Sequence, residues 1–206
     1  PDLIFRRLRT DLIYYGPRCM MIRPKTGAPQ LIQWNRAQLY LHERLEEQRR
    51  RTGKVRAIIL KYRQGGITTY VQARFYHQCT GAKGVRAFIL THESQASENV
   101  FGITRRYHEN CPPDMRPHVD RDSNKELNFD LLDSGYKVAT AGTKGTGRSQ
   151  TIQLFHGSEV AFWPNADDHA AGVLQAIPDE AGTESILEST AFGANNFFHK
   201  PRQDAE

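Results

Sequence analysis

Apolar residues recur with two spacings along the chain, and each change of spacing marks the boundary of a predicted element. The run VRAIIL at residues 55–60 is apolar apart from one arginine and predicts a buried parallel strand. Two glycines separate it from residues 67–79, where helical spacing begins. Residues 85–91 predict a second strand and residues 93–108 a second helix. This order is typical of a parallel sheet with crossover helices.

Two further helices are predicted before this unit. Residues 1–15 alternate arginines with apolar residues at helical spacing, and a loop-rich passage follows from Gly16-Pro17. Together they predict an N-terminal arm, residues 1–30, before a main domain, residues 31–206. Asn35 is the predicted cap of the second helix. The apolar side of that helix is expected to comprise Ala37, Leu39, Tyr40, Leu41 and Leu45.

Mostly strands are predicted in the second half of the chain. Residues 127–132 and 136–141 flank the turn sequence Asp133-Ser134-Gly135 and predict a β-hairpin. Further strands are predicted over residues 151–155 and 183–190. The predicted fold is therefore an α/β domain with a mainly parallel central sheet.

The sequence KYRQGGITT at residues 61–69 joins the first predicted strand to its helix and has the composition of a phosphate-binding loop. The first amides of a helix have no intrahelical partner, and the helix dipole adds positive charge, so an anion is stabilised there. Gly65 and Gly66 let the backbone come close, and Thr68 or Thr69 offers a hydroxyl to a magnesium ion. The alternative is an ordinary strand-to-helix turn of an α/β domain.

The basic residue of this loop is not in its usual place. In the pattern G-x-x-x-x-G-K-[ST] a lysine precedes the hydroxyl residue, whereas here Ile67 precedes Thr68. Lys61 and Arg63 lie upstream in the same turn, and either brings a positive charge to the phosphates. Arg63 is favoured because a guanidinium offers a planar fork to phosphate oxygens.

The predicted strand at residues 151–155 leads into HGSEVAFW, which places a carboxylate beyond the strand end. Glu159 is the candidate base for a water molecule, since side chains at the carboxyl ends of parallel strands lie beside the phosphate site. Ser158 stands where phosphate-loop ATPases usually have the aspartate that holds magnesium, so weak metal binding is predicted. Gly157-Ser158 lacks the G-x-S-x-G context of a hydrolase serine.

Three other polar positions belong to the candidate site. Gln38 lies in the first turn of the helix after Asn35, and its amide suits an adenine edge, although an isolated helical glutamine is more often solvated. Ser189 and Thr190 end the strand predicted over residues 183–190. Side chains at such a place sense whether a γ-phosphate is present, or they simply cap the strand end.

Composition and charge narrow the class of protein. Of 206 residues, 28 are Lys or Arg and 23 are Asp or Glu, and this basic excess permits an anionic partner such as nucleic acid. No apolar run reaches the roughly 18 residues of a membrane span, and the N-terminus lacks the pattern of a secretory signal. Three widely spaced cysteines argue against a disulfide framework. These features predict a cytoplasmic protein without a membrane partner.

Five motifs, in their order and spacing, resemble the N-terminal ATPase domain of the large terminase subunit of tailed bacteriophages. They are LIQWNRAQ, KYRQGGITT, GRSQT, FHGSEVAFW and ESTAFGANNFF, and the similarity spans Leu31 to Phe198. The resemblance implies a P-loop NTPase of the RecA-like (ASCE) class, a three-layer sandwich with a mainly parallel sheet. It also implies hydrolysis of ATP with Mg²⁺ to drive double-stranded viral DNA into a prohead.

The resemblance assigns roles to individual residues. Gln38 falls on the family's adenine-contacting glutamine, and Glu159 falls on its catalytic glutamate, whereas Ser158 departs from the usual aspartate. Ser189 and Thr190 fall on the motif that couples hydrolysis to movement. The family's phosphate loop falls on Arg63, Gln64, Gly65, Gly66, Thr68 and Thr69.

Partners follow from the same resemblance. Arg148 is similar in place to an arginine that some members insert into a neighbouring subunit's site, which requires a ring of identical subunits. Duplex DNA held through its backbone, a portal protein, a small terminase subunit and the host cytoplasm are also implied. Full-length members carry a C-terminal nuclease for which the chain has no room after the coupling motif, so an isolated ATPase domain is expected.

Two other functions are compatible with the motifs. A nucleotide-gated DNA-binding or assembly module that hydrolyses almost no ATP would explain Ile67 and Ser158. A helicase-like DNA-dependent ATPase would need downstream helicase motifs, which the sequence does not contain. Steady-state ATP hydrolysis separates the nearly inactive module from an ATPase.

Overall fold

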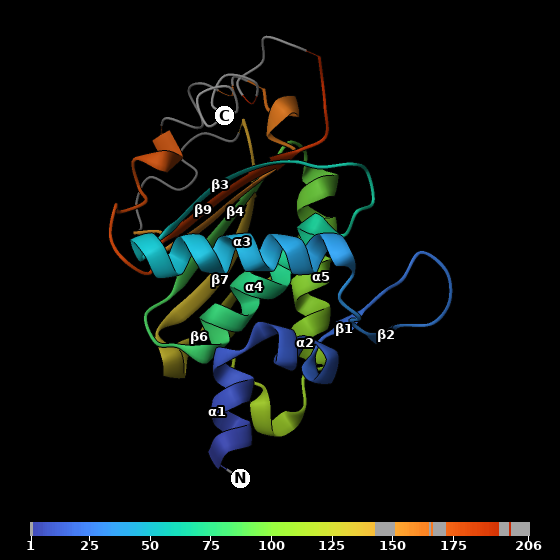
Figure 1. Cartoon of the computed structure of the whole chain (residues 1–206), viewed down its shortest axis with the longest axis vertical. Coiled ribbons are helices and arrows are strands. Elements are labelled where there is room, and N and C mark those ends of the chain that lie inside the picture. The colour runs from blue at the N-terminus through green and yellow to red at the C-terminus, as the bar shows by residue number, and fades with distance from the viewer. Residues whose placement is uncertain (1, 143–150, 165, 167–171, 194–197, 199–206) are drawn as a thin grey trace.

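A seven-stranded sheet forms the centre of the computed structural model, which describes residues 2–142, 151–164, 166, 172–193 and 198 (Figure 1). The strands are β3 Val55–Leu60, β4 Arg86–Thr91, β5 Arg121–Asp122, β6 Glu126–Phe129, β7 Ser134–Thr140, β8 Leu154–Ser158 and β9 Glu184–Ser189. Their order across the sheet is β3-β9-β8-β4-β7-β6-β5. The first five run parallel, and β6 and β5 continue the sheet antiparallel. The predicted α/β class with a mainly parallel sheet is thereby confirmed.

The long helices α3, α4 and α5 cover one face of this sheet (Figure 1). The described helices are α1 Asp2–Thr10, α2 Leu12–Cys19, α3 Arg36–Thr52, α4 Ile67–Gly81 and α5 Ser94–Glu109, with 3₁₀ turns η1 Pro113–Met115, η2 Asp130–Leu132 and η3 Val160–Phe162. A two-stranded sheet of β1 (Met21–Ile22) and β2 (Gln30–Leu31) lies between α2 and α3 in the chain. The bounds of α4 and α5 agree with the predicted helices to within two residues.

The sheet separates two apolar cores. Along β4, Ala87 and Ile89 join the core under the helices, whereas Phe88 and Leu90 join the core on the opposite face. This alternation is what a strand buried on both faces requires. The second core is closed by side chains of η3 and of the segments that follow it.

The helical part of the N-terminal arm extends further than predicted. α1 ends at Thr10, and α2 continues through Gly16 and Pro17, where a loop was expected. Pro17 has no amide hydrogen for the carbonyl of Ile13, and the indole of Trp34 donates to that carbonyl instead, at 3.1 Å. Gly16 leaves space for the same indole, because a Cβ there would lie 2.2 Å from its Cζ2. A long-range contact therefore overrides the local loop signal.

α3 begins where predicted, but only part of its predicted apolar side is buried. Asn35 and Gln38 form a reciprocal capping box at its start. The fully buried residues of the helix are Gln38 and Leu45, whereas Leu39 and Tyr40 are exposed. The predicted apolar side was therefore wrong at these two positions, because α3 lies against the edge of the sheet and buries only a narrow stripe.

Within the described part of the chain, β3 is an edge strand that pairs with β9 alone. It is consequently less buried than its apolar sequence predicted, and Leu60 at its end is exposed. β9 lies between β3 and β8, so β8, which leads to Glu159, is not the direct neighbour of β3. The end of β9 thereby enters the space between the loop and Glu159.

Cys19, Cys79 and Cys111 are free and buried, as expected for a chain without a disulfide framework. Burial raises the pKa of the Cys79 thiol to about 12, so this thiol is not a nucleophile at neutral pH. Among the described residues, no helix combines the length and the apolar character needed to cross a bilayer.

Candidate active site

Residues 61–66 form the loop between β3 and α4. Gly66 is the N-cap of α4 and has a φ of 77°, in the left-handed region. A Cβ at this position would lie 2.7 Å from Nε2 of Gln38, so both the backbone angle and the space require glycine. α4 opens without a side-chain cap, which leaves its first amides available for an anion.

Two polar side chains at the start of α3 hold this loop in place. Asn35 Nδ2 donates to the carbonyl of Gly65 at 3.1 Å, and Gln38 Nε2 donates to the carbonyl of Gly66 at 2.8 Å. The amide oxygen of Gln38 accepts from the backbone N–H of Asn35. Gln38 is only 4% exposed and binds the loop backbone, and its contact with adenine stays a prediction.

A pocket of about 320 Å³ opens beside the loop at the carboxyl ends of the parallel strands. The loop forms one side of it, and the segment after β8, which carries Glu159, forms another. Two elements that lie far apart in the sequence thus meet at one cavity. The lining residues are Lys61, Arg63, Gln64, His92, Glu159, Phe162 and Thr190.

Lys61 is the cation at the centre of the site. Its ammonium donates to Thr68 Oγ1 at 2.9 Å, lies 3.1 Å from Oε1 of Glu159 and forms an ion pair with Glu188. The side chain is only 10% exposed, and these three oxygens match the three N–H donors of an ammonium. Thr68, the candidate metal-binding hydroxyl, therefore lies in one cluster with two carboxylates.

Glu188, near the end of β9, is a site residue that the sequence analysis did not identify. Its side chain is fully buried, and its Oε1 accepts from Ser158 Oγ at 2.8 Å and from Thr68 Oγ1 at 3.0 Å. Nε2 of His156 lies 3.4 Å from the same oxygen. Burial alone raises the pKa of Glu188, but His156 and Lys61 outweigh burial and lower this pKa to about 2. The carboxylate is therefore ionised at neutral pH.

A signal for Glu188 is present in the sequence of β9. The strand, ESILES, is buried at every position. Carboxylates are rare in such strands unless they are paired, and Glu184 and Glu188 are four residues apart, on one face of the strand. Arg74 of α4 pairs with Glu184, and Lys61 pairs with Glu188. Two acids in a buried strand thus indicate basic partners on the elements packed against it.

Glu159 directly follows β8 and has a φ of 52°, which is uncommon for a residue other than glycine. Its Oε2 accepts from the amide and the hydroxyl of Thr190, both at 3.1 Å, and from Ser189 Oγ at 3.4 Å. Its Oε1 faces Lys61. The carboxylate therefore connects Lys61, at the start of the loop, to the end of β9.

The remaining predicted residues take varied positions. Arg63 and Gln64 are exposed and line the pocket, and within the described part of the chain Arg63 makes no ion pair or hydrogen bond. Thr69 lies in the first turn of α4, where its carbonyl accepts from the hydroxyl of Tyr107 at 3.1 Å. Arg148, the candidate arginine for a neighbouring subunit, lies outside the described residues.

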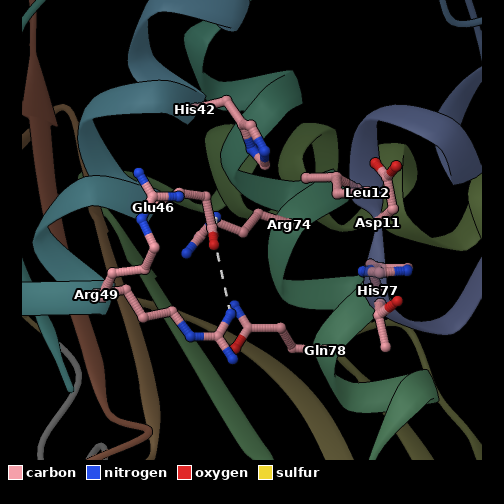
Figure 2. Close-up of a pocket in the computed structure, with 10 residues that line it drawn as sticks. Asp11, Leu12, His42, Glu46, Arg49, Arg74, His77 and Gln78 are labelled. Atoms are coloured by element: carbon pink, nitrogen blue, oxygen red, sulfur yellow. Dashed lines mark hydrogen bonds and ion pairs between the residues drawn. The ribbon is translucent and has the colours of Figure 1, made fainter. Parts of the chain in front are cut away.

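A second pocket, of about 230 Å³, lies on the helical face between α3, α4 and the start of α2 (Figure 2). Glu46 points into it towards Arg74, whose Nη1 lies 2.6 Å from the carboxylate (Figure 2). Because Arg74 also pairs with Glu184, its positive charge is neutralised by carboxylates of the protein itself. This pocket shares no lining residue with the loop pocket. It is lined by Thr10, Asp11, Leu12, His42, Glu46, Arg49, Arg50, Arg74, His77 and Gln78.

The oxygens around Thr68 suit a magnesium ion. No group of three or more His, Cys, Asp or Glu that could hold a metal occurs in the described ranges, so an all-protein cage is absent there. Mg²⁺ usually binds one or two carboxylates and takes its other ligands from water and phosphate. Thr68, Glu159 and Glu188 offer one hydroxyl and two carboxylates, and the Lys61 ammonium shows that they hold a cation.

Three solved structures resemble the chain in fold. The crystal structure of the HK97 bacteriophage large terminase matches 96% of the chain with a TM-score of 0.75 at 15% identity. The ATPase domain of the large terminase of Thermus phage P74-26 matches 82% of it with a TM-score of 0.60, and a mutant of that domain has a TM-score of 0.59, both at 16% identity. The fold is that of these terminase structures, as the sequence resemblance implied.

The chain spans 41% of the length of the HK97 chain and 68% and 69% of the two Thermus phage chains. No protein-family model matches its sequence, and no curated protein does. At 15–16% identity the likeness establishes the fold alone. The activity therefore has to be argued from the geometry of the site.

Proposed function

We propose that the chain is a P-loop ATPase that hydrolyses ATP to drive double-stranded viral DNA into a prohead. The observation that carries this proposal is the single pocket shared by the phosphate loop and Glu159. The fold supports it, because the similar structures are phage large terminases and terminase ATPase domains. ATP is the proposed substrate and Mg²⁺ the proposed cofactor.

The loop is proposed to bind the phosphates through its backbone. The first amides of α4 lack intrahelical partners, and Gly65 and Gly66 keep side chains away from them. Arg63 is exposed on the pocket lining without a partner among the described residues, so its planar fork is free to bind phosphate oxygens. Lys61 is the second cation within the site, and both residues offset charge that develops on the transferred phosphoryl group.

Glu159 is proposed to orient the attacking water molecule. Its carboxylate lines the pocket and is held from one side by Thr190 and from the other by Lys61, so its position is fixed before the nucleotide arrives. A preorganised acceptor loses little free energy to reorganisation during the reaction. Because Glu159 also contacts Ser189, we assign Ser189 and Thr190 to the coupling of hydrolysis with movement.

The hydroxyl of Thr68 is the proposed protein ligand for the metal. Magnesium, when bound with the nucleotide, supplies neutralisation of phosphate charge. Ser158 is less suited to a direct contact, since its hydroxyl is buried and donates to Glu188. This geometry leaves the carboxylates as the stronger oxygen donors beside Thr68.

Packaging requires partners beyond this chain. Duplex DNA, a portal protein, a small terminase subunit and a ring of identical copies on the prohead are proposed from the resemblance, as are the host cytoplasm and the insertion of Arg148 into a neighbouring site. Residues 31–206 are proposed to form the ATPase domain, with residues 1–30 as an arm. Leu8, Leu12 and Tyr15 of that arm join the same core as α4.

Steady-state ATP hydrolysis, measured with Mg²⁺ in the presence and absence of duplex DNA, tests the proposal. We expect Glu159→Gln to lower the rate by roughly 100-fold or more, because it removes the general base, while binding of a fluorescent ATP analogue persists. Glu180 is exposed and lies outside the pocket, so Glu180→Gln removes the same charge and should leave the rate unchanged.

Equal, slow turnover by the wild-type chain and Glu159→Gln would contradict the enzymatic proposal. Retained nucleotide binding in that case would favour a nucleotide-gated binding or assembly module. Separation of duplex strands by the wild-type chain would instead favour a helicase-like ATPase.

A further inference from the structure

Glu188 is the one fully buried carboxylate in the candidate site as described. Its neighbours are the hydroxyls of Thr68 and Ser158, the ammonium of Lys61 and the imidazole of His156. A buried charge is costly unless it is paired, and here Oε1 accepts from two hydroxyls while Oε2 forms the ion pair with Lys61. The position therefore maintains a negative charge directly behind the phosphate loop.

The register of the sheet relates Glu188 to Ser158. The two residues are direct partners across the parallel strands β8 and β9, and Ser158 Oγ donates to Glu188 Oε1 at 2.8 Å. The sequence motif led us to expect an aspartate at position 158. Ionised carboxylates at both positions would repel each other, so an acid on one strand favours a hydroxyl on the other.

The surroundings of Glu188 already hold a cation. The Lys61 ammonium lies between Thr68, Glu159 and Glu188, which are hard oxygen donors of the kind that Mg²⁺ prefers. The hydroxyl of Thr68, the proposed metal ligand, donates to Glu188 at 3.0 Å. A carboxylate this close to a metal ligand is placed to orient that ligand or to bind the water shell of the ion.

We propose that Glu188 is the carboxylate that supports the metal ion of the nucleotide complex, in the role that an acid at position 158 would otherwise have. Ser158 is then a positioning residue that orients Glu188 through its hydroxyl. Lys61 is the counter-ion of Glu188 within the chain. This inference rests on the proposed function, since it assigns a metal partner in the same nucleotide site.

Titration of Mn²⁺ into the complex of the chain with a non-hydrolysable ATP analogue tests the inference, with free Mn²⁺ measured by electron paramagnetic resonance. We expect Glu188→Gln to weaken Mn²⁺ binding by about 10–100-fold, as losses of supporting carboxylates typically do. Ser158→Ala should weaken it less, and Glu180→Gln should not change it. Nucleotide binding in the presence of EDTA should remain in all three variants.

The double variant Ser158→Asp/Glu188→Gln moves the carboxylate from β9 to the paired position on β8. We expect it to recover most of the lost Mn²⁺ affinity, because the two positions are paired in register. It also restores a counter-ion for Lys61, so it serves as the test if Glu188→Gln does not fold alone. A folded double variant without recovered Mn²⁺ binding would overturn the proposal.

Wild-type Mn²⁺ affinity in Glu188→Gln would likewise overturn the proposal, as would a larger loss in Ser158→Ala than in Glu188→Gln. These failures differ from a failure of the proposed function. In the latter case the wild-type chain would not bind the ATP analogue at all, with Mn²⁺ or with EDTA.

Discussion

Two carboxylates share one lysine in the candidate site but have different surroundings. Glu188 is buried and accepts hydrogen bonds from the hydroxyls of Thr68 and Ser158. The side chain of Glu159, in contrast, is 23% exposed and lines the pocket. Glu159 also has a left-handed backbone conformation, a local strain of the kind found at functional residues. Glu159 therefore lies on the side of Lys61 that faces the pocket, and Glu188 lies on the side that faces the protein interior.

Unfolding in acid tests the environment of Glu188. Its pKa falls from 4.5 to about 2 in the folded chain, so its stabilising contribution is present above pH 4.5 and is lost as the pH falls towards 2. This shift corresponds to about 3 kcal/mol at about 1.4 kcal/mol per pH unit. Urea unfolding at pH 5 and pH 2 should show that the wild-type chain loses this much more free energy of unfolding than Glu188→Gln.

Acid sensitivity that is identical in the wild-type chain and Glu188→Gln would contradict this environment. Glu180→Gln is the matched control, because it removes an exposed carboxylate and should leave the acid sensitivity unchanged. The comparison between variants cancels the titration of the other carboxylates.

At the residue scale, the sequence was informative where chemistry depends on a local motif. Gly66 could be recognised because a turn between strand and helix favours glycine, and the structure shows both the positive φ and the lack of space. Glu188 was missed because its role depends on Lys61 and Ser158, which come from two other strand ends. No local pattern states which strand ends will be neighbours.

At the scale of elements, Arg74 joins three of them. From α4 it pairs with Glu184 on β9, at 2.7 Å, and with Glu46 on α3, at 2.6 Å. Gln78, one turn further along α4, donates to Glu184 at 3.0 Å. This buried network fixes α4, and hence the amides at its start, against the sheet.

Stability measurements on Arg74 test this network. We expect Arg74→Met to lower the free energy of unfolding by about 3–5 kcal/mol, because it leaves the buried carboxylate of Glu184 unpaired. The double variant Arg74→Met/Glu184→Leu should regain most of that loss, since both charges are then replaced by apolar groups. Urea unfolding at neutral pH measures both values, and a single-variant loss below about 1 kcal/mol would contradict the assignment.

The elements themselves were largely predictable. Periodicity located α4, α5, β4 and the antiparallel pair of β6 and β7, because each has a spacing that its own packing requires. The turn of that pair was placed too late, since residues 130–133 connect the strands and Ser134 and Gly135 already belong to β7. The extent of α2 was not predictable, since its continuation through Pro17 depends on the Trp34 indole, which comes from a later segment. The exposure of Leu39 and Tyr40 on α3 was also missed, because an edge position exposes residues that are apolar in sequence.

At the scale of the whole molecule, the strand order builds the site. β9 is the last of the described strands in chain order, yet it lies between β3 and β8, the strand that precedes Glu159. This insertion places Glu188, Ser189 and Thr190 between the loop and Glu159. One strand end therefore contacts both the loop after β3 and Glu159.

A crystal structure of the chain with a non-hydrolysable ATP analogue and Mg²⁺ tests the central claim most directly. The account predicts the triphosphate on the amides that open α4, with Lys61 or Arg63 in contact with phosphate oxygens and Glu159 facing the γ-phosphate. An analogue bound elsewhere, or bound with its triphosphate pointing away from the pocket shared by Arg63 and Glu159, would contradict the account.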